Sequence, residues 1–478
     1  MMRIPAKGLG KEALLEKLHS YAVADVPSLD GRMWAYVYHP GQEAYEVGQQ
    51  AYMQFLAPNV LDFTVYPSTV QFERDLVAMA AAHVGGDEQV VGNFTSGGTE
   101  SCMLAVKTAR DYFRVRRPEI HTPEIILPES AHPAFHKAAH YFGLKVISTP
   151  LDPRSLRADP DTVRAAITPC TILIVGSAPS YPYGVVDPIP ALGQIALDHG
   201  LWLHCDACVG GFMLPYLRRL GIAVPDFDFG VPGVTSLSMD LHKYGYTPKG
   251  ASIVLYRHRE LRKHQIFAFS RWPGYTVVNN TMQGSKTAGP VAAAWAVVQF
   301  IGDDGYLELA RRSYEATQRL IAGIEGIDGL RLIARPDMFL FAFTSDTASI
   351  FHIIDEMRER HWVIQPQLAF GTVKENIHLT VSASNVPWVD AFLADLRQCT
   401  ERAATMESGR YAAMVHEFLA SLSPSAWVED AFGQMLETLG LKGGALPRRT
   451  APINEMLNAL PAGLRDLALT SYLNDVFS

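Results

Sequence analysis

Lys243 has the setting of a reactive amine. It follows a run of apolar and hydroxyl-bearing residues that ends in Asp-Leu-His-Lys, and a dense loop pattern, Tyr-Gly-Tyr-Thr-Pro-Lys-Gly, comes directly after it. A second apolar run, residues 251–256, is typical of a buried strand. A lysine enclosed between two buried strands loses solvent, which lowers its pKa and makes its amine a usable nucleophile. We therefore interpret Lys243 as a covalent anchor for a cofactor.

A segment of small residues, Ser-Gly-Gly-Thr-Glu-Ser at positions 96–101, opens onto an amphipathic helical pattern. Gly97 and Gly98 would let the backbone approach an anion closely, and the free N–H groups of a helix start favour a phosphate. Thr99 adds a hydroxyl group. The spacing matches neither the dinucleotide nor the P-loop fingerprint, so an ordinary helix start stays as the alternative.

Asp206 ends an apolar run, Leu-Trp-Leu-His-Cys, and small residues follow it. A carboxylate at the carboxyl end of a buried parallel strand lies where α/β folds bind ligands. There it could hold a proton on the ring nitrogen of pyridoxal phosphate, with a helix-capping role as the alternative. Cys205 and Cys208 have the C-x-x-C spacing of metal sites, but no second pair follows, so we interpret them as small packing residues.

His132 precedes Pro133, a residue suited to the first position of a helix, so its imidazole should lie at the helix mouth. With His136 and His140 it recurs every fourth residue, which raises the question of a metal site. No acidic or cysteine partner lies nearby in the sequence, and we predict no metal. A flat imidazole over a flat cofactor ring is the favoured role for His132, whereas the other two are expected on the helix face.

These segments occur in an order that resembles the sphingosine-1-phosphate lyase family, within the group II decarboxylase-like enzymes that use pyridoxal phosphate. The similarity covers residues 31–400. The matching stretches are Ser-Gly-Gly-Thr-Glu-Ser, Ser-Ala-His-x-Ala-Phe-x-Lys-Ala-Ala-x-Tyr-Phe-Gly, His-x-Asp-Ala-Cys-x-Gly-Gly-Phe and Asp-x-His-Lys-Tyr-Gly-Tyr-x-Pro-Lys-Gly. The resemblance implies an α/β fold of type I, with a mostly parallel seven-stranded sheet in a large domain and a smaller C-terminal α/β domain. It also implies pyridoxal 5'-phosphate as cofactor and a homodimer that shares its active sites.

The resemblance also gives roles to single residues. Lys243 is the lysine that binds the cofactor covalently, Asp206 pairs with its ring nitrogen and His132 stacks on its ring, and these three are the expected catalytic residues. The whole expected cofactor-binding set is Gly97, Gly98, Thr99, His132, Asp206, Cys208, His242, Lys243 and, from the other subunit, Ser285.

Substrate contacts are expected at Asn59, Asp62, Tyr246, Lys249 and Lys286. Asp62 stands where the family has a histidine of its phosphate grip, and an aspartate facing a phosphate would repel it. Lys286 stands where the family has an arginine, so it keeps the charge but loses the planar fork. The resemblance implies retro-aldol cleavage of a phosphorylated sphingoid base, or a related β-hydroxy amine, to a long-chain aldehyde and phosphoethanolamine. The two departures leave open a pyridoxal-dependent amino-acid decarboxylase, because Lys286 could hold a carboxylate.

The length of 478 residues predicts several lobes. We expect an N-terminal helical segment over residues 1–60, a cofactor-binding domain over 61–300, a small domain over 301–402 and a helical extension over 403–478. Strand patterns lie at 125–127, 145–148, 171–176, 201–204, 233–239 and 252–256, then at 330–334, 338–344 and 376–381. Helical patterns lie at 44–56 and 69–83, from Trp295 onward, and at 457–469, where the leucines suggest one amphipathic helix.

Charge and composition exclude several classes of protein. The net charge of −8 argues against nucleic acid as a partner. Five cysteines, an odd number mostly in apolar runs, point to a reducing compartment and hence the cytoplasm. No apolar run reaches the roughly 20 residues of a transmembrane segment. The chain therefore resembles a soluble, bacterial-type version of the family.

Overall fold

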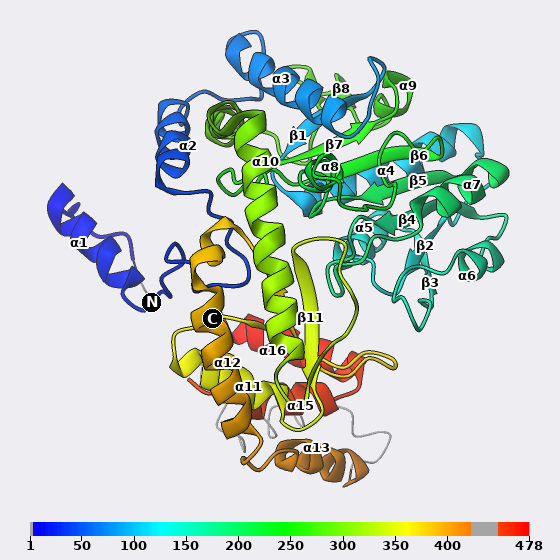
Figure 1. The fold of residues 1–478 in the computed structure, drawn as a ribbon. Helices are drawn as coiled ribbons and strands as arrows, with labels where there is room; N and C mark the ends of the chain where they lie inside the picture. The colour runs from blue at the N-terminus through cyan, green and yellow to red at the C-terminus, as the bar shows by residue number, and fades with distance from the viewer. Residues whose placement is uncertain (1–2, 422–447, 478) are drawn as a thin grey trace.

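The computed structural model describes residues 3–421 and 448–477, and its centre is a seven-stranded sheet (Figure 1). The strand order is β1-β7-β6-β5-β4-β2-β3. All neighbours run parallel except β7, which is antiparallel to both β6 and β1. The strands are β1 (Val91–Thr95), β2 (Glu124–Pro128), β3 (Lys145–Thr149), β4 (Thr171–Ser177), β5 (Trp202–Asp206), β6 (Val234–Met239) and β7 (Ser252–Tyr256). The predicted mostly parallel sheet of seven strands is confirmed.

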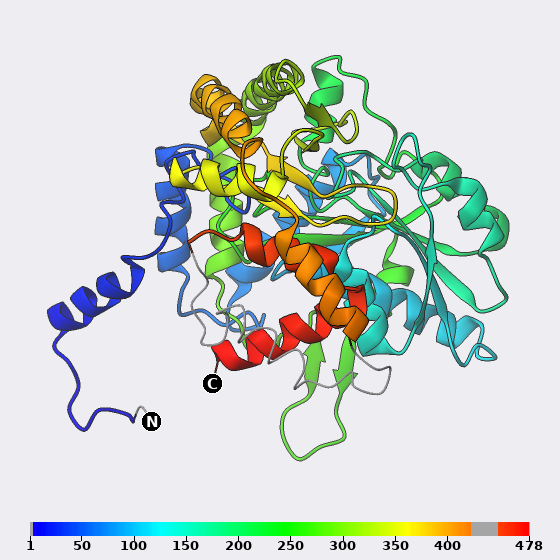
Figure 2. The same ribbon diagram turned by 90° about the horizontal axis from the view of Figure 1, so that it is seen from below.

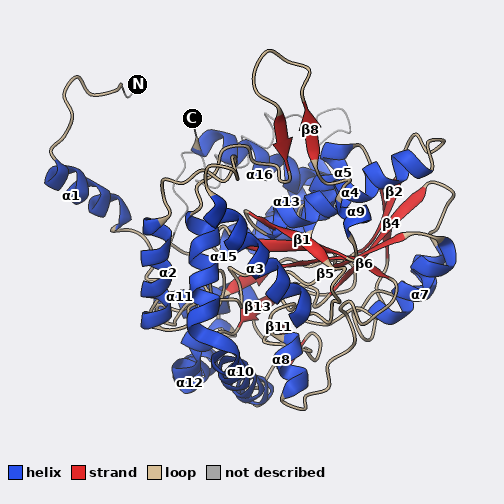
Figure 3. Cartoon of the chain, turned by 90° about the horizontal axis from the view of Figure 1, so that it is seen from above, coloured by secondary structure: helices blue, strands red, loops and turns tan. Residues whose placement is uncertain are grey.

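Two helical layers cover this sheet (Figure 3). The helices of the large domain are α3 (Pro67–His83), α4 (Gly98–Arg116), α5 (Pro133–Phe142), α6 (Pro160–Ala165), α7 (Ile189–His199), α8 (Leu214–Arg219) and α9 (Arg259–Arg262). In β2, Ile125 and Leu127 pack with α4 and α5, whereas Ile126 packs with α3 and α7. Alternate strand residues point to opposite faces, so burial on both sides explains why the parallel strands appear in the sequence as continuous apolar runs.

The segment of small residues at 96–101, expected to open onto a helix, is mostly helical itself, and a strand that the sequence did not indicate, β1, comes directly before it. Residues 91–95 pair antiparallel with β7, and α4 already begins at Gly98. Gly92 permits the pairing, because an added Cβ would lie 2.4 Å from the Val254 carbonyl oxygen. The loop that faces the sheet edge is therefore only Ser96 and Gly97.

A smaller lobe is built on a second sheet, in which the order β10-β11-β13-β12 is antiparallel throughout. Its elements are β10 (Leu330–Leu332), β11 (Leu340–Ser345), α11 (Ile350–Glu359), β12 (Gln365–Gln367), β13 (Asn376–Thr380), the 3-10 helix η1 (Ala383–Trp388) and α12 (Val389–Ala403). The long helix α10 (Gly289–Glu325) joins the two lobes and begins before the predicted Trp295. It breaks at Gly302, where φ and ψ are 64° and 174°. The predicted division between residues 300 and 301 stays a proposal, which this break supports.

Two elements project from the body of the chain (Figure 2). The helix α1 (Lys11–Ala22) has no buried residue, and α2 (Gln42–Gln54) after it packs against α10. The hairpin of β8 (Phe267–Phe269) and β9 (Val277–Asn279) extends in a different direction.

The C-terminal extension folds as α13 (Arg410–Ser421), α15 (Ala451–Ala459) and α16 (Ala462–Val476), with residues 422–447 outside the described part. The expectation of one helix over 457–469 is wrong. Leu460 is extended, with φ −73° and ψ 137°, because Pro461 disfavours helical geometry in the residue before it. In the described ranges, no helix has the length and apolar character that a bilayer crossing requires.

Candidate active site

One cavity of about 340 Å³ lies at the carboxyl ends of β4 and β5, next to the start of α4. This is the place where α/β folds bind ligands. It brings together every predicted cofactor-binding residue of this chain except Ser285: Gly97, Gly98, Thr99, His132, Asp206, Cys208, His242 and Lys243. Residues from distant parts of the sequence thus converge on one enclosed space.

The start of α4 offers an anion site at one end of this cavity. Gly97 precedes the helix with a φ of 151°, and no side chain caps the helix, so its first N–H groups stay available. Gly98 allows close approach, because an added Cβ would lie 2.6 Å from Asp240 Oδ2. Thr99 follows and lines the same cavity.

An ion pair between Lys243 and Asp240 is the feature that sequence reasoning missed. Lys243 Nζ lies 2.9 Å from Asp240 Oδ2. Burial lowers the pKa of the lysine, but the Asp240 carboxylate raises it, and the net pKa lies well above its ordinary value. The expectation of a lowered pKa for Lys243 is therefore wrong. The sequence did contain a signal for this ion pair, because Asp240 stands only three residues before Lys243, which is within one turn of chain. The backbone does turn here, and the Lys243 N–H donates to the Asp240 carbonyl oxygen.

Asp206 and His132 present a fixed carboxylate and a fixed imidazole to the cavity. Asp206 Oδ1 accepts hydrogen bonds from the Cys208 N–H at 3.1 Å and from the Ser238 hydroxyl at 3.4 Å. His132 Nδ1 accepts from the Ala134 N–H at 3.2 Å. Enclosure lowers the pKa of His132, with Asp206 opposing it, so the ring is neutral near pH 7. The other two histidines of its spacing pattern, His136 and His140, are exposed on α5, as expected.

These groups fit pyridoxal 5'-phosphate. The uncapped helix start suits its phosphate, the Lys243 amine suits its aldehyde carbon, the Asp206 carboxylate suits its ring nitrogen and the His132 ring suits one of its faces. Asp240 Oδ1 is buried without a hydrogen-bond partner at the Gly98 wall of the same cavity. An unsatisfied acceptor inside a protein is costly, so this oxygen calls for a hydrogen-bond donor.

The two cysteines of the C-x-x-C spacing lie in opposite layers of the fold. Cys205 packs with the α3 and α7 side of the sheet, and Cys208 packs with the α4 and α5 side. They therefore do not close on one site, in agreement with their interpretation as packing residues. Cys208 also lines the cavity, as the resemblance implies.

Glu100 ties the anion site to a distant segment. Its Oε2 accepts from the Ser96 N–H at 2.6 Å and hydroxyl at 2.7 Å, while its Oε1 accepts from the Met282 N–H at 2.7 Å. Met282 lies just before Ser285. Sequence analysis did not single out Glu100, because its partner in the chain is 182 residues away.

None of the five predicted substrate contacts lines this cavity, and two of them have other roles in the chain. Tyr246 is 3% exposed, and its hydroxyl accepts from the Ala383 N–H at 3.4 Å, so it is a core residue. Asp62 caps an exposed turn, accepting from the Thr64 N–H at 2.9 Å and hydroxyl at 2.6 Å. Neither side chain lines the cavity of its own chain, and their substrate roles stay predictions.

Two of the other predicted substrate contacts and the predicted cofactor contact Ser285 line a second cavity of about 330 Å³, which borders the first at Ser96. Lys249, Ser285 and Lys286 line it, and the Lys286 N–H donates to Asn59 Oδ1 at 3.3 Å. Burial lowers the pKa of Lys249 to about 8, and its Nζ donates to the Tyr36 carbonyl oxygen at 2.9 Å. Two amines therefore face this cavity, which suits an anionic ligand.

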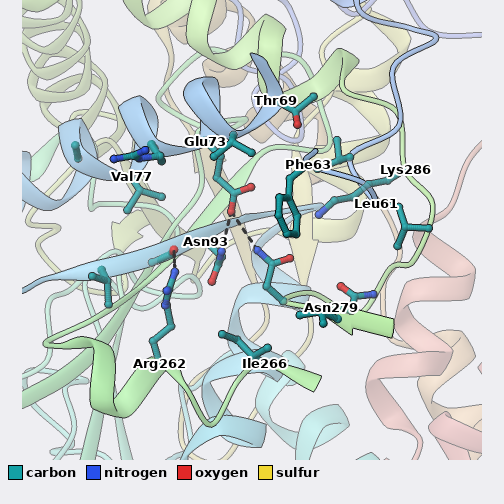
Figure 4. A pocket seen from close by; sticks show the side chains of 18 of the residues that line it. Leu61, Phe63, Thr69, Glu73, Val77, Asn93, Arg262, Ile266, Asn279 and Lys286 are labelled. Atoms are coloured by element: carbon teal, nitrogen blue, oxygen red, sulfur yellow. Dashed lines mark hydrogen bonds between the residues drawn. The ribbon is translucent and has the colours of Figure 1, made fainter. Parts of the chain in front are cut away.

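A third cavity, of about 570 Å³, lies between α3 and β9 (Figure 4). It is largely apolar and reaches Lys286, which also lines the second cavity. Glu73 Oε1 accepts from Asn93 Nδ2 at 2.8 Å and Asn280 Nδ2 at 3.5 Å on its wall. It is the largest of the three, but Lys243 and Asp206 line only the first, so the chemistry belongs there.

Comparisons with known proteins agree with this assignment. Residues 50–345 match the family model described as the pyridoxal-dependent decarboxylase conserved domain, and residues 413–475 match one described as a pyridoxal-dependent enzyme, C-terminal putative HTH domain. The sphingosine-1-phosphate lyase of Arabidopsis thaliana is 43% identical over 406 residues, covering 83% of this chain and 73% of that protein.

Two further similarities bear on function. A probable L-aspartate decarboxylase of Pyrococcus furiosus is 32% identical over 366 residues, covering 76% of this chain and 95% of that protein. Among solved structures, the sphingosine-1-phosphate lyase of Burkholderia pseudomallei superimposes with a TM-score of 0.80 at 36% identity, covering 89% of this chain and 98% of that chain.

Proposed function

Because this chain belongs to the sphingosine-1-phosphate lyase family of pyridoxal-dependent enzymes, we propose that it cleaves a phosphorylated sphingoid base into a long-chain aldehyde and phosphoethanolamine. The chain is a lyase that uses pyridoxal phosphate. The observation that carries the assignment is the convergence of Lys243, Asp206 and His132 on one cavity beside an uncapped helix start. The relatives named for this substrate cover most of the chain, and Lys249 and Lys286 offer charge for a phosphate.

The residues of the cavity divide the work of the reaction. The cofactor, when bound, withdraws electrons from the substrate carbon that carries the amine. Asp206, whose carboxylate is fixed by two hydrogen bonds, would hold a proton on the ring nitrogen by its charge. His132 would lie against one face of the ring.

Cleavage requires two proton transfers. A proton leaves the substrate hydroxyl as the carbon–carbon bond breaks, and a proton returns to the carbon that carries the amine. Lys243, Tyr181 and His132 line the cavity and are among its groups that can move these protons. Asp240 holds the Lys243 amine in its charged form, which suits proton donation.

A homodimer is the proposed assembly, with Asn59, Ser285 and Lys286 completing the site of the partner subunit. These residues lie together in this chain but not around Lys243. The segments that carry them expose large apolar side chains, as an uncovered subunit interface does. These are Met53, Leu56, Phe63, Val65, Trp272, Tyr275, Val278 and Met282.

Mixing two inactive variants tests this sharing. Lys243→Ala removes the anchor and Lys286→Ala removes the partner's contact, so each homodimer is expected to be nearly inactive. Random mixing puts the two variants together in half of the dimers, and each such dimer has one intact site, so about a quarter of wild-type activity should return. Activity is measured after co-expression of differently tagged chains. A mixture of Lys243→Ala with Asp206→Ala, both on the cavity side, is the matched control and should stay inactive. Equal recovery in both mixtures, or none in either, contradicts a shared site.

An amino-acid decarboxylase is the second candidate function. It is favoured by the similarity to the Pyrococcus furiosus protein and by Lys249 and Lys286, whose charges would also hold a carboxylate. The lyase is preferred because identity to the relatives named as lyases is higher.

A product assay separates the two reactions. Incubation of the holoenzyme with a phosphorylated sphingoid base is expected to yield a long-chain aldehyde and phosphoethanolamine in equal amounts, measured by mass spectrometry. L-Aspartate and L-glutamate, tested in parallel, should release no carbon dioxide above a Lys243→Ala blank. Carbon dioxide release without aldehyde would replace the lyase with the decarboxylase.

The cytoplasm is the proposed location. Support comes from Cys102, Cys205, Cys208 and Cys399, which are buried as free thiols, since a reducing compartment preserves such thiols.

A further inference from the structure

A continuous line of buried polar side chains leads away from Asp206 into the sheet. Trp202, His204 and Asp206 alternate along β5 and therefore share one face. Ser236 and Ser238 of β6 stand opposite His204 and Asp206 in the parallel register. The exposed fraction is 1% or less for the four side chains behind Asp206.

Hydrogen bonds join these residues end to end. Trp202 Nε1 lies 2.7 Å from Ser236 Oγ, which lies 2.8 Å from His204 Nδ1. His204 Nε2 lies 3.2 Å from Ser238 Oγ, which lies 3.4 Å from Asp206 Oδ1.

The chemistry of the two ends fixes the direction of every hydrogen bond. The Asp206 carboxylate only accepts, so the Ser238 hydroxyl donates to Oδ1 and accepts from His204 Nε2. A neutral His204 then carries its single proton on Nε2, and its Nδ1 accepts from the Ser236 hydroxyl. The indole of Trp202 only donates, so Ser236 accepts from it as well.

A charged His204 would break this order, because Nδ1 would no longer accept from Ser236. Burial lowers the pKa of His204 to about 4, with the Asp206 charge opposing it, so the ring is neutral near pH 7. The line is therefore satisfied in this arrangement, in which Ser238 Oγ also accepts from the Cys208 thiol at 3.2 Å. Buried polar networks of this kind hold their members in fixed positions.

The line ends on one oxygen of Asp206 and leaves the other for the cavity. Among the described residues, the hydrogen bonds that the Asp206 side chain accepts from the Cys208 N–H and the Ser238 hydroxyl both end on Oδ1. Asp206 also lines the 340 Å³ cavity. Oδ2 is thus the oxygen free to meet a ring nitrogen.

We propose that His204 is a positioning residue which, acting through Ser238, aims the Asp206 carboxylate at the ring nitrogen of the cofactor. This inference rests on the proposed role of Asp206 toward that nitrogen and not on the identity of the substrate. His204 itself touches neither cofactor nor substrate, since it does not line the cavity.

Binding of two cofactor forms by the substituted full-length apoprotein tests the proposal. One form is pyridoxal phosphate and the other is its analogue with carbon in place of the ring nitrogen. Ser238→Ala, a small change that a well-packed strand tolerates, and His204→Phe are each expected to weaken pyridoxal phosphate about 10- to 100-fold, as loss of a hydrogen bond to a charged group does. Binding of the carbon analogue should stay unchanged, because it has no nitrogen for Asp206 to meet.

Rescue and control variants separate positioning from folding. His204→Gln presents an acceptor to Ser236 and a donor to Ser238, so it should bind pyridoxal phosphate within about threefold of wild type. The double variant His204→Phe with Ser238→Ala should lose no more than either single variant, because both break the same line. Tyr256→Phe removes another buried hydrogen bond, the 3.1 Å contact with Thr108, and should alter neither cofactor form.

If both cofactor forms bind more weakly to the same degree, His204 has only a structural role. If the binding of both forms is unchanged, the line of hydrogen bonds does not position Asp206. Either result overturns the inference even if His204→Phe fails to fold, since Ser238→Ala reports on the same line. The readout uses no substrate. It therefore stays separate from the product assay, whose failure would change the reaction but not this network.

Discussion

Replacing Lys243 with alanine is expected to abolish turnover, by at least about 10³-fold, while the chain stays folded. The lysine is the only one that lines the cavity shared with Asp206 and His132 in the described part of the chain, and its amine lies at the Asp240 end. The variant should still bind the cofactor without a covalent bond. Borohydride reduction of the wild-type holoenzyme, followed by peptide mass spectrometry, should place the cofactor mass on Lys243 and on no residue of the variant.

Lys249→Ala is the matched control, because Lys249 lies in the neighbouring cavity and six residues along the same loop. It should keep the covalent label on Lys243 and lose substrate affinity instead. A label on Lys249 in the wild-type protein would place the anchor in the second cavity and contradict the assignment of the active site to the first.

Asp206→Asn is expected to lower kcat by about 10²- to 10³-fold, the range for removing one preorganised electrostatic group. The amide keeps the shape of the carboxylate but cannot hold a proton on a ring nitrogen by charge. The measurements are kcat with substrate and the absorption spectrum of the bound cofactor, which reports the protonation of its ring. Rising cofactor concentration should restore occupancy, which the loss of charge also lowers, but should not restore kcat, because the charge acts in the reaction as well.

Asp187→Asn serves as its control, because Asp187 is also buried and accepts N–H hydrogen bonds, from Ser177 at 2.8 Å and Ala158 at 2.8 Å, but does not line the cavity. It should reduce the melting temperature with little change in kcat for the folded fraction. If both variants lose the same fraction of kcat, the charge of Asp206 has no role in the reaction beyond that of an ordinary buried carboxylate.

Features of the fold that depend on local sequence were predicted correctly. The central strands are apolar because helices cover both faces, and the uncapped glycine pair at the start of α4 follows from its composition. Lys243 and Asp206 come together because both follow the carboxyl ends of neighbouring strands, β6 and β5.

The features that sequence reasoning missed depend on long-range contacts. The pKa of Lys243 was predicted in the wrong direction, because burial is visible in a pattern but the 2.9 Å contact with Asp240 is not. Glu100 reaches a segment far along the chain, and Tyr246 turns into the core at a φ of 56° that a loop pattern does not reveal. The residues expected to be shared between subunits remain a prediction, since a single chain shows no contacts with a second subunit.

The wall between Gly98 and Asp240 has a practical consequence for redesign. A single methyl group at position 98 would collide with the carboxylate that holds the Lys243 amine. The helix start that would bind the phosphate and the carboxylate that holds the reactive amine are therefore in direct contact, and a change at one affects the other. An engineer who wishes to retune phosphate recognition at the helix start cannot do so independently of the reactive amine, and libraries that vary position 98 should vary position 240 in the same clone.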